Sequence, residues 1–188
     1  MKELVELDQN ILQIRAQNFI GRYSFSSNFQ YLVGWKTQGS PVLFLENEYL
    51  LWEKQLTKVI EAKVSDMGYV ALSEWTDPAG YKGCFWVFVR DGRTLLKAEM
   101  GALPMSVAID PQGTLACCWA SYRKLIGKTH VTDAEAFVFS LTSPSLLFSA
   151  HLPECEVEAV ARSGKEIVIV TKSGAHRFSE DGTPSVKR

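Results

Sequence analysis

The chain has 188 residues, of which 46% are hydrophobic and 22% are charged, and its formal net charge is −1. These values match ordinary globular domains and argue against disorder and against a fibrous protein. The balanced charge argues against a general nucleic-acid binder, which needs a basic excess to neutralise phosphates. No apolar run is long enough for a membrane helix, and the N-terminus does not resemble a signal peptide, so we expect one cytoplasmic domain without membrane contact.

Residues 1–17 contain the stretch VELDQNILQI, which aligns with the later stretch FVRDGRTLLK. A short amphipathic helix is the alternative interpretation of this segment. The later stretch carries an Asp-Gly turn between two apolar runs, which is typical of a β-hairpin. The alignment therefore predicts that residues 1–17 form a hairpin, equivalent to half of the unit that repeats further along the chain.

From residue 18 onward a unit of four predicted strands recurs about four times. In its first half, an apolar strand, a polar turn and a second strand end at an equivalent position, which is Trp35, Trp75, Trp119 or Val170. Its second half is centred on Phe44, Phe88, Phe139 or Phe178. Both landmarks return after about 40 to 50 residues, a period typical of repeat architectures. The predicted units cover residues 18–57, 58–103, 104–153 and 154–188.

Each half of the unit has the composition of a β-hairpin. The turns SDMG, DPQG, RDGR and EDGT contain glycines that can adopt positive φ, and the flanking runs are rich in Val, Leu, Ile, Phe and Trp. Tryptophans at equivalent repeat positions favour packing between units over three separate binding platforms. Cys84, Cys117, Cys118 and Cys155 have no metal-ligand spacing, and we expect them to be small buried residues.

A repeated unit of four antiparallel strands resembles the blade of WD40-like and PQQ-like β-propellers. The stretch SVAIDPQGTLACCW is the most blade-like, with Asp110, Gly113 and Trp119 where such blades place a turn aspartate, a turn glycine and a packing aromatic. The sequence shows no signature of a named subfamily. The resemblance implies a single all-β, propeller-like domain of about four four-stranded blades after an N-terminal half-unit.

The half-unit lacks an obvious mate, because the C-terminal unit already carries its own second half. Complete propellers usually hold four to eight blades. Three arrangements therefore stay open: a part of a larger propeller, an unusual small ring, or a ring completed by a second chain. Unmatched edge strands would favour a homo-oligomer, since open edges pair readily with other strands.

The resemblance also implies that loops joining the second to the third strand gather on a ligand-binding face. Two such loops, residues 74–83 and 120–135, are longer than a hairpin requires. The candidate binding residues in these loops are Glu74, Asp77, Tyr81, Tyr122, Arg123, Lys124, Lys128 and His130. The cationic group suits a phosphate, a carboxylate or an acidic protein surface, and the acids suit a cation or acid–base chemistry. A solvated loop and an ordinary Asp-Pro-Ala-Gly turn are the plainer alternatives.

The sequence contains no nucleophile motif, no glycine-rich phosphate loop and no metal-ligand pair of His or Cys, so we expect neither a metal nor a cofactor. The leading hypothesis is a non-catalytic binding module or scaffold that holds a protein partner on its blade loops. The alternatives are a propeller hydrolase or lyase with an axial site, and a carbohydrate-binding module that uses exposed tryptophans.

Overall fold

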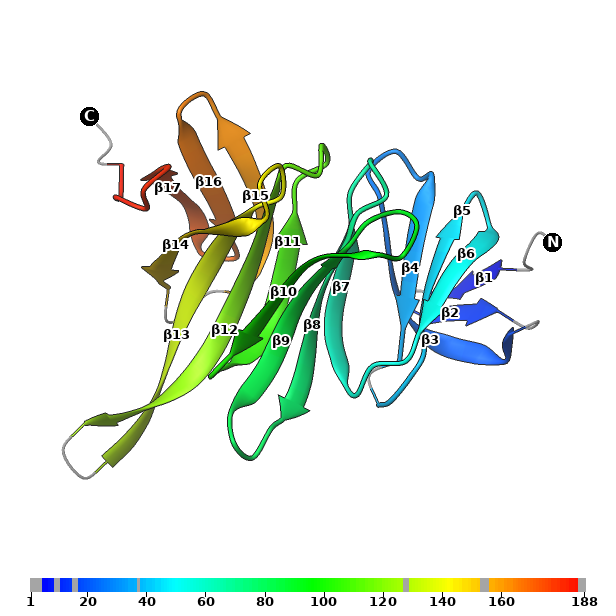
Figure 1. Ribbon diagram of the computed structural model, residues 1–188, viewed down its shortest axis with the longest axis horizontal. Coiled ribbons are helices and arrows are strands. Elements are labelled where there is room, and N and C mark those ends of the chain that lie inside the picture. Colours follow the sequence, from blue (N-terminus) through cyan, green and yellow to red (C-terminus); the bar gives the residue numbers. More distant parts are fainter. Residues whose placement is uncertain are drawn as a thin grey trace.

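The computed structural model describes residues 5–8, 11–14, 17–36, 38–126, 129–152 and 156–185. These residues form antiparallel β-sheets and contain no α-helix, which confirms the predicted all-β fold (Figure 1). The strands lie in four sheets, in the orders β1-β2-β3-β4-β5-β6, β10-β9-β8-β7, β11-β12-β13-β14 and β15-β16-β17. We use the name blade for each successive group of strands.

The strands of the blades have the following bounds. Blade 1 contains β3 (Phe19–Phe25), β4 (Tyr31–Trp35), β5 (Val42–Glu46) and β6 (Tyr49–Lys54). Blade 2 contains β7 (Val59–Val64), β8 (Val70–Asp77), β9 (Lys82–Phe88) and β10 (Thr94–Met100). Blade 3 contains β11 (Leu103–Ile109), β12 (Leu115–Ile126), β13 (Thr129–Ser140) and β14 (Ser145–His151). Blade 4 contains β15 (Val157–Ser163), β16 (Glu166–Thr171) and β17 (Gly174–Ser179).

The N-terminal segment is a β-hairpin, as its alignment with the repeat predicts, and not a helix. Strand β1 (Val5–Asp8) pairs with β2 (Ile11–Ile14), and β2 pairs with β3, so the hairpin enlarges the first sheet to six strands. Leu12, Ile14 and Phe19 are buried with Leu32, Leu43 and Leu45 of blade 1. The hairpin therefore covers the face of blade 1 that points away from blade 2.

The blades are held together by three apolar cores, one between each pair of neighbours. Because side chains alternate between the two faces of a strand, each central strand contributes to two cores. In β12, for example, Cys117 faces blade 4 while Ala116 and Cys118 face blade 2. Cys84, Cys117 and Cys118 are buried, as the sequence predicts, and Cys155 lies outside the described residues.

Three tryptophans at equivalent repeat positions tie each blade to the next. The indole Nε1 donates a hydrogen bond to a backbone carbonyl of the following blade or the segment leading into it, from Trp35 to Ile60 at 3.3 Å, from Trp75 to Pro104 at 2.8 Å and from Trp119 to Leu152 at 2.6 Å. This confirms the interpretation of these tryptophans as packing residues between blades.

We expect Trp75→Phe to lower the free energy of unfolding by about 1 kcal/mol, because the variant keeps an aromatic ring but leaves the Pro104 carbonyl without its donor. Urea denaturation followed by circular dichroism measures the change. Tyr49→Phe, at a side chain that is 49% exposed, serves as the control and should unfold like the parent chain. An equal loss in both variants would show that the indole hydrogen bond does not contribute.

The turns between the first two strands of blades 2 and 3 have the predicted glycine geometry. Gly68 and Gly113 adopt φ of 76° and 66°, and a Cβ atom at Gly113 would lie 2.9 Å from the Tyr69 ring. The Asp110 carboxylate accepts hydrogen bonds from the backbone nitrogens of Thr114 at 2.6 Å and Leu115 at 2.7 Å. Local sequence thus fixes these turns.

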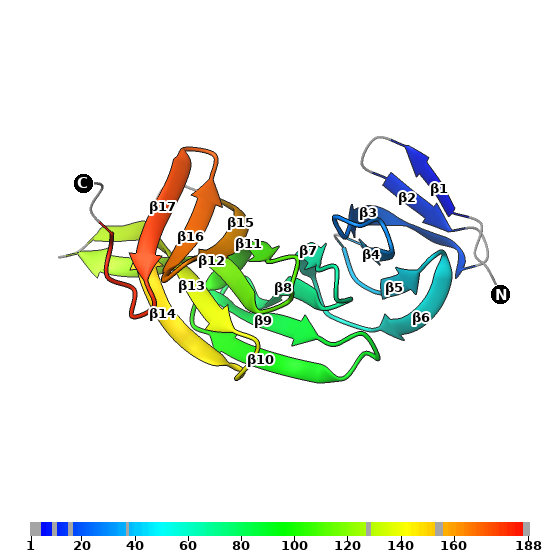
Figure 2. The ribbon, with the colours of Figure 1, turned by 90° about the horizontal axis from the view of Figure 1, so that it is seen from above.

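The four sheets follow one another in an arc and do not close into a ring (Figure 2). Blade 4 stands at one end of the arc and the N-terminal hairpin at the other, and the two chain ends lie on opposite sides of the molecule. Blade 4 has three strands, and Pro184 makes only an isolated bridge to Phe178 of β17. No helix in the described part of the chain is long and apolar enough to cross a membrane.

Candidate functional site

The predicted long loop at residues 120–135 is a β-ribbon and not a loop, which corrects that part of the sequence analysis. Strands β12 and β13 pair without interruption from Leu115 opposite Ser140 to Ile126 opposite Thr129. The flanking strands β11 and β14 pair with this ribbon only as far as Ser121 and Glu135. The remainder projects from blade 3 as a two-stranded arm (Figure 1).

The root of the arm contacts the other predicted loop. The Arg123 guanidinium lies 4.6 Å from the centroid of the Tyr81 ring, a cation–π contact between blade 3 and blade 2. Tyr81 belongs to the turn between β8 and β9 and has a φ of 52°. Two candidate residues that are far apart in the sequence are therefore brought together.

A polar cluster stiffens the same root on the blade 3 side. The Tyr122 hydroxyl donates to Asp133 at 3.2 Å or to Glu135 at 3.3 Å, and His151 Nε2 lies 2.6 Å from Asp133 Oδ1. Burial of the hydroxyl, assisted by the two carboxylates, raises the pKa of Tyr122 to about 12. The hydrogen bond from His151 lowers the pKa of Asp133 below its ordinary value. At neutral pH the tyrosine is therefore neutral and can donate a hydrogen bond to the charged Asp133 carboxylate.

The other candidates have structural roles or lie outside the described part. Glu74 is 4% exposed and accepts hydrogen bonds from Thr57 N at 2.7 Å and Trp86 Nε1 at 2.8 Å. Asp77 Oδ1 accepts a hydrogen bond from Gly80 N at 3.0 Å, as in the plainer turn interpretation. Lys128 lies outside the described residues, and so do the side chains of Lys124 and His130.

A groove of about 550 Å³ runs between blades 2 and 3, next to the root of the arm. Strand β10 and the turn after it form one wall, and β12, β13 and β14 form the other. The lining residues are Ala98, Glu99, Met100, Gly101, Ala102, Tyr122, Arg123, Glu135, Phe137, Phe139 and Leu146. Its floor is thus apolar, and charged side chains stand at the rim. Leu146 is 51% exposed, so its side chain is accessible at the mouth of the groove.

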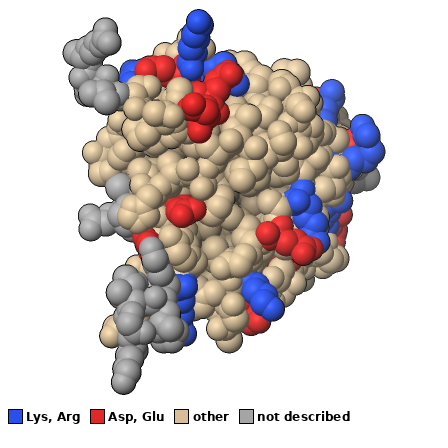
Figure 3. Space-filling model, turned by 60° about the vertical axis from the view of Figure 1, so that its left-hand side comes forward, with Lys and Arg blue, Asp and Glu red and all other residues tan. Residues whose placement is uncertain are grey.

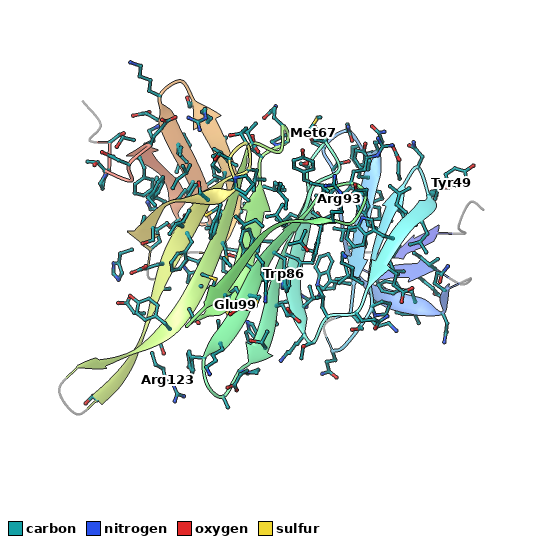
Figure 4. The ribbon with its side chains drawn as sticks, in the orientation of Figure 1. Tyr49, Met67, Trp86, Arg93, Glu99 and Arg123 are labelled. Carbon is teal, nitrogen blue, oxygen red and sulfur yellow. The ribbon has the colours of Figure 1, made fainter. Side chains whose placement is uncertain are left out.

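The groove runs from the root of the arm, at Tyr122 and Arg123, to Phe139 and Leu146 beside the turn that joins β13 to β14. In Figure 4, Arg123 projects at the root of the arm on blade 3 and Glu99 lies on the neighbouring part of blade 2, while Met67 and Arg93 mark the other end of the strands.

Figure 3 shows that acidic and basic side chains occur in small mixed groups on one face and leave wide uncharged areas between them. Among the described residues, no group of three or more His, Cys, Asp or Glu side chains could hold a metal ion.

Six residues of this region were not among the predicted site residues: Glu99, Asp133, Glu135, Phe137, Leu146 and His151. The sequence gives little indication of these residues, because each lies in an ordinary strand. Their place in the site depends on contacts with residues of other strands. The pairing of Tyr122 with Asp133 follows from the strand register of the arm. Composition alone identifies the segment only as a long connection, so it does not give this register.

No family of known proteins matches the sequence, and a search of curated proteins also finds no match. Solved structures do match. The computationally designed protein Ika4 has a TM-score of 0.55 at 15% identity, over 84% of this chain and 88% of that chain. The β-propeller domain of Cps50 (Swd1) from Myceliophteria thermophila has a TM-score of 0.52 at 9% identity, over 95% of this chain and 62% of that chain. The chain has an open β-propeller fold.

A third propeller, Sqt1 from Chaetomium thermophilum, was solved with the N-terminus of a ribosomal protein bound, and matches with a TM-score of 0.57 at 14% identity. The match covers 94% of this chain and 51% of that chain. Our propeller thus spans between half and two thirds of the length of these two natural propellers. These identities show the fold alone, and the distinction between the WD40-like and PQQ-like kinds stays a prediction.

We expect the contact between His151 and Asp133 to make stability depend on pH. Because the pKa of Asp133 is lowered in the folded state, this contact stabilises the fold above the ordinary value of 3.8, and the contribution is lost as pH falls through the lowered pKa. His151→Ala should therefore lower the free energy of unfolding at neutral pH, and the difference from the parent chain should vanish once the pH is below the lowered pKa of Asp133. Urea denaturation at several pH values measures it. Asp133→Asn combined with His151→Ala provides the control, and a pH-dependent His151→Ala effect that persists in the Asp133→Asn background would contradict this assignment.

Proposed function

We propose that this propeller is a non-catalytic binding module whose groove between blades 2 and 3 holds a segment of a protein partner. The observation that carries the proposal is the apolar floor of Met100, Phe137, Phe139 and Leu146, left open between two edge strands. Such a floor accepts apolar side chains, and its charged rim orients them. The four blades and the N-terminal hairpin are proposed to act as one domain.

The walls of the groove favour an extended segment as the ligand. Among the described residues, strands β10 and β14 are the outer strands of their sheets, so each has one edge without a neighbouring strand in its sheet. A peptide could therefore add as a strand to one of these edges and place alternate side chains on the floor. At the rim, Glu99 is ion-paired with Lys97, Glu135 is a hydrogen-bond partner of Tyr122, and Arg123 lies over the Tyr81 ring. We propose a ligand with an apolar side chain that packs on the floor.

The comparison with Sqt1 supports the same kind of role, because that propeller holds a terminal segment of another protein. The alternatives find less support. The enzyme hypothesis requires side chains from several blades to converge around an axis, and the four sheets do not close into a ring. The carbohydrate hypothesis requires exposed tryptophans, whereas Trp35, Trp75 and Trp119 bind the next blade or the segment leading into it through their indole nitrogens.

Selection from a displayed library of short peptides, followed by calorimetric titration, tests the proposal. We expect the selected peptides to bind the parent chain and to bind Leu146→Lys about 10- to 100-fold more weakly, since the substitution places a charge on the apolar floor of the groove. Arg123→Glu should also change the affinity. Leu51→Lys is the matched control, because Leu51 is 41% exposed on β6, away from the groove, and should leave binding intact. Equal binding by Leu146→Lys and the parent chain would refute the groove as the site.

A further inference from the structure

The two ends of the arc differ in how their outermost faces are covered. At the first end, the N-terminal hairpin covers blade 1, and the leucines of blade 1 are buried beneath it. At the other end, blade 4 uses only one face of its sheet for the core with blade 3, where Ile167 and Ile169 are fully buried. The opposite face of blade 4 carries no neighbouring blade (Figure 2).

The uncovered face of blade 4 has the residues of an interface between blades. Val168 and Val170 alternate with the buried isoleucines, so they point to the uncovered side. The pairing of β15, β16 and β17 places three alanines, Ala159, Ala161 and Ala175, beside these two valines on the same face. In the repeat, Val168 occupies the place of Cys117, which is buried against the next blade. The face therefore has a shallow apolar centre of small side chains around Val170, and the ion pair between Arg177 and Glu166 borders it next to Val168.

At the first end of the arc, the outer surface of β2 and of the adjoining strand β3 carries exposed apolar side chains. Ile11 is 50% exposed and Ile20 is 58% exposed, two of the few large apolar side chains that remain exposed in the described residues. Gln13 pairs with Ile20 across the β2–β3 ladder, so Ile11, Gln13 and Ile20 share one face. Two isoleucines protrude at this end, and small valines and alanines leave room at the other.

We propose that two copies of this chain associate end to end, with the N-terminal hairpin of each copy packed on the uncovered face of blade 4 of the other. One copy spans 51% of Sqt1 and 62% of Cps50 (Swd1), so two copies together supply about as many blades as a complete ring. Each end binds the unlike end of the partner, and two such contacts related by a twofold axis close the assembly. No end is then left exposed.

Mass measurement tests the association on the 188-residue chain. Size-exclusion chromatography with light scattering, supported by sedimentation over a range of concentrations, should give twice the 21.0 kDa of one chain. Ile20→Lys and Val170→Glu should each weaken the dimer about 100-fold, because each substitution buries an unpaired charge in an apolar contact. Tyr49→Lys, at an exposed position of β6, should leave the dimer unchanged.

The combination of Ile20→Lys with Val170→Glu separates a direct contact from a folding defect. In the dimer each lysine then faces a glutamate of the partner, so the double variant should recover dimerisation that both single variants have lost. Circular dichroism spectra identical to that of the parent chain show that the single variants fold. A parent chain that stays monomeric at all concentrations, or single variants that dimerise like the parent, would overturn the proposal. Peptide binding in the groove does not depend on either result.

Discussion

Phe85→Ala is expected to lower the free energy of unfolding by about 3 to 5 kcal/mol, the largest loss of any single change considered for this propeller. Phe85 is fully buried in the core between blades 2 and 3, and its ring is stacked on Phe139 with centroids 5.0 Å apart. The truncation removes this stacking and leaves a cavity that two packed sheets cannot fill. Since domains of this kind are stable by only about 5 to 15 kcal/mol, the variant should be close to unfolding.

Urea denaturation at 25 °C measures this loss. Met67→Ala removes a side chain that is 57% exposed in a turn of blade 2, and it should change the free energy of unfolding by about 0.5 kcal/mol or less. If Phe85→Ala proved as mild as Met67→Ala, the apolar core between blades 2 and 3 would not be what holds them together. The unfolding transition would then have to reflect the sheets alone.

Glu74→Ala is expected to lower the free energy of unfolding by about 2 to 4 kcal/mol, because it leaves two donors without an acceptor. The Glu74 carboxylate accepts from the backbone nitrogen of Thr57, in the segment that enters blade 2, and from the indole of Trp86 in β9. Glu74 thereby connects the segment that leads into blade 2 with strand β9 in the middle of the sheet of blade 2. A carboxylate that is 4% exposed and fully engaged has a structural role, in contrast to the acid–base role considered from the sequence.

The conservative variant and a binding assay distinguish the two roles. Glu74→Gln keeps one oxygen acceptor and the same shape, so it should lose clearly less stability than Glu74→Ala. Both variants should bind a groove-selected peptide with the affinity of the parent chain at temperatures where they are folded. A loss of peptide binding by folded Glu74→Gln would show instead that Glu74 contributes to the binding site.

Much of the fold follows from local sequence because the repeat fixes local structure. Gly68 and Gly113 mark turns that only a residue tolerant of positive φ can make easily, and the strands around them alternate or are continuously apolar. Trp35, Trp75 and Trp119 indicate contacts between blades because they recur at one position of the unit. These signals are short-range, and each is repeated several times. The blade boundaries at residues 18–57, 58–103, 104–153 and 154–188 stay predictions.

The binding site depends on long-range pairing and is therefore harder to predict. Residues 120–135 were expected to form a loop because their polar composition masks the strand pairing, and a register shift of one residue would change every partner of Tyr122. The contact between Arg123 and Tyr81 joins two blades and has no signature in either segment. Whether the N-terminal hairpin pairs with its own chain or with another chain also depends on tertiary structure, because its sequence is compatible with both.

Hydrogen exchange measured by mass spectrometry, with and without a peptide selected for binding, tests the central claim most directly. If the groove between blades 2 and 3 holds the ligand, the backbone amides of β10 and β14 should become protected, together with the root of the arm near Tyr122. The turns around Asn28 and Met67, at the opposite end of the strands, should exchange as before. Protection confined to those turns, with β10 and β14 unchanged, would contradict the proposed binding site.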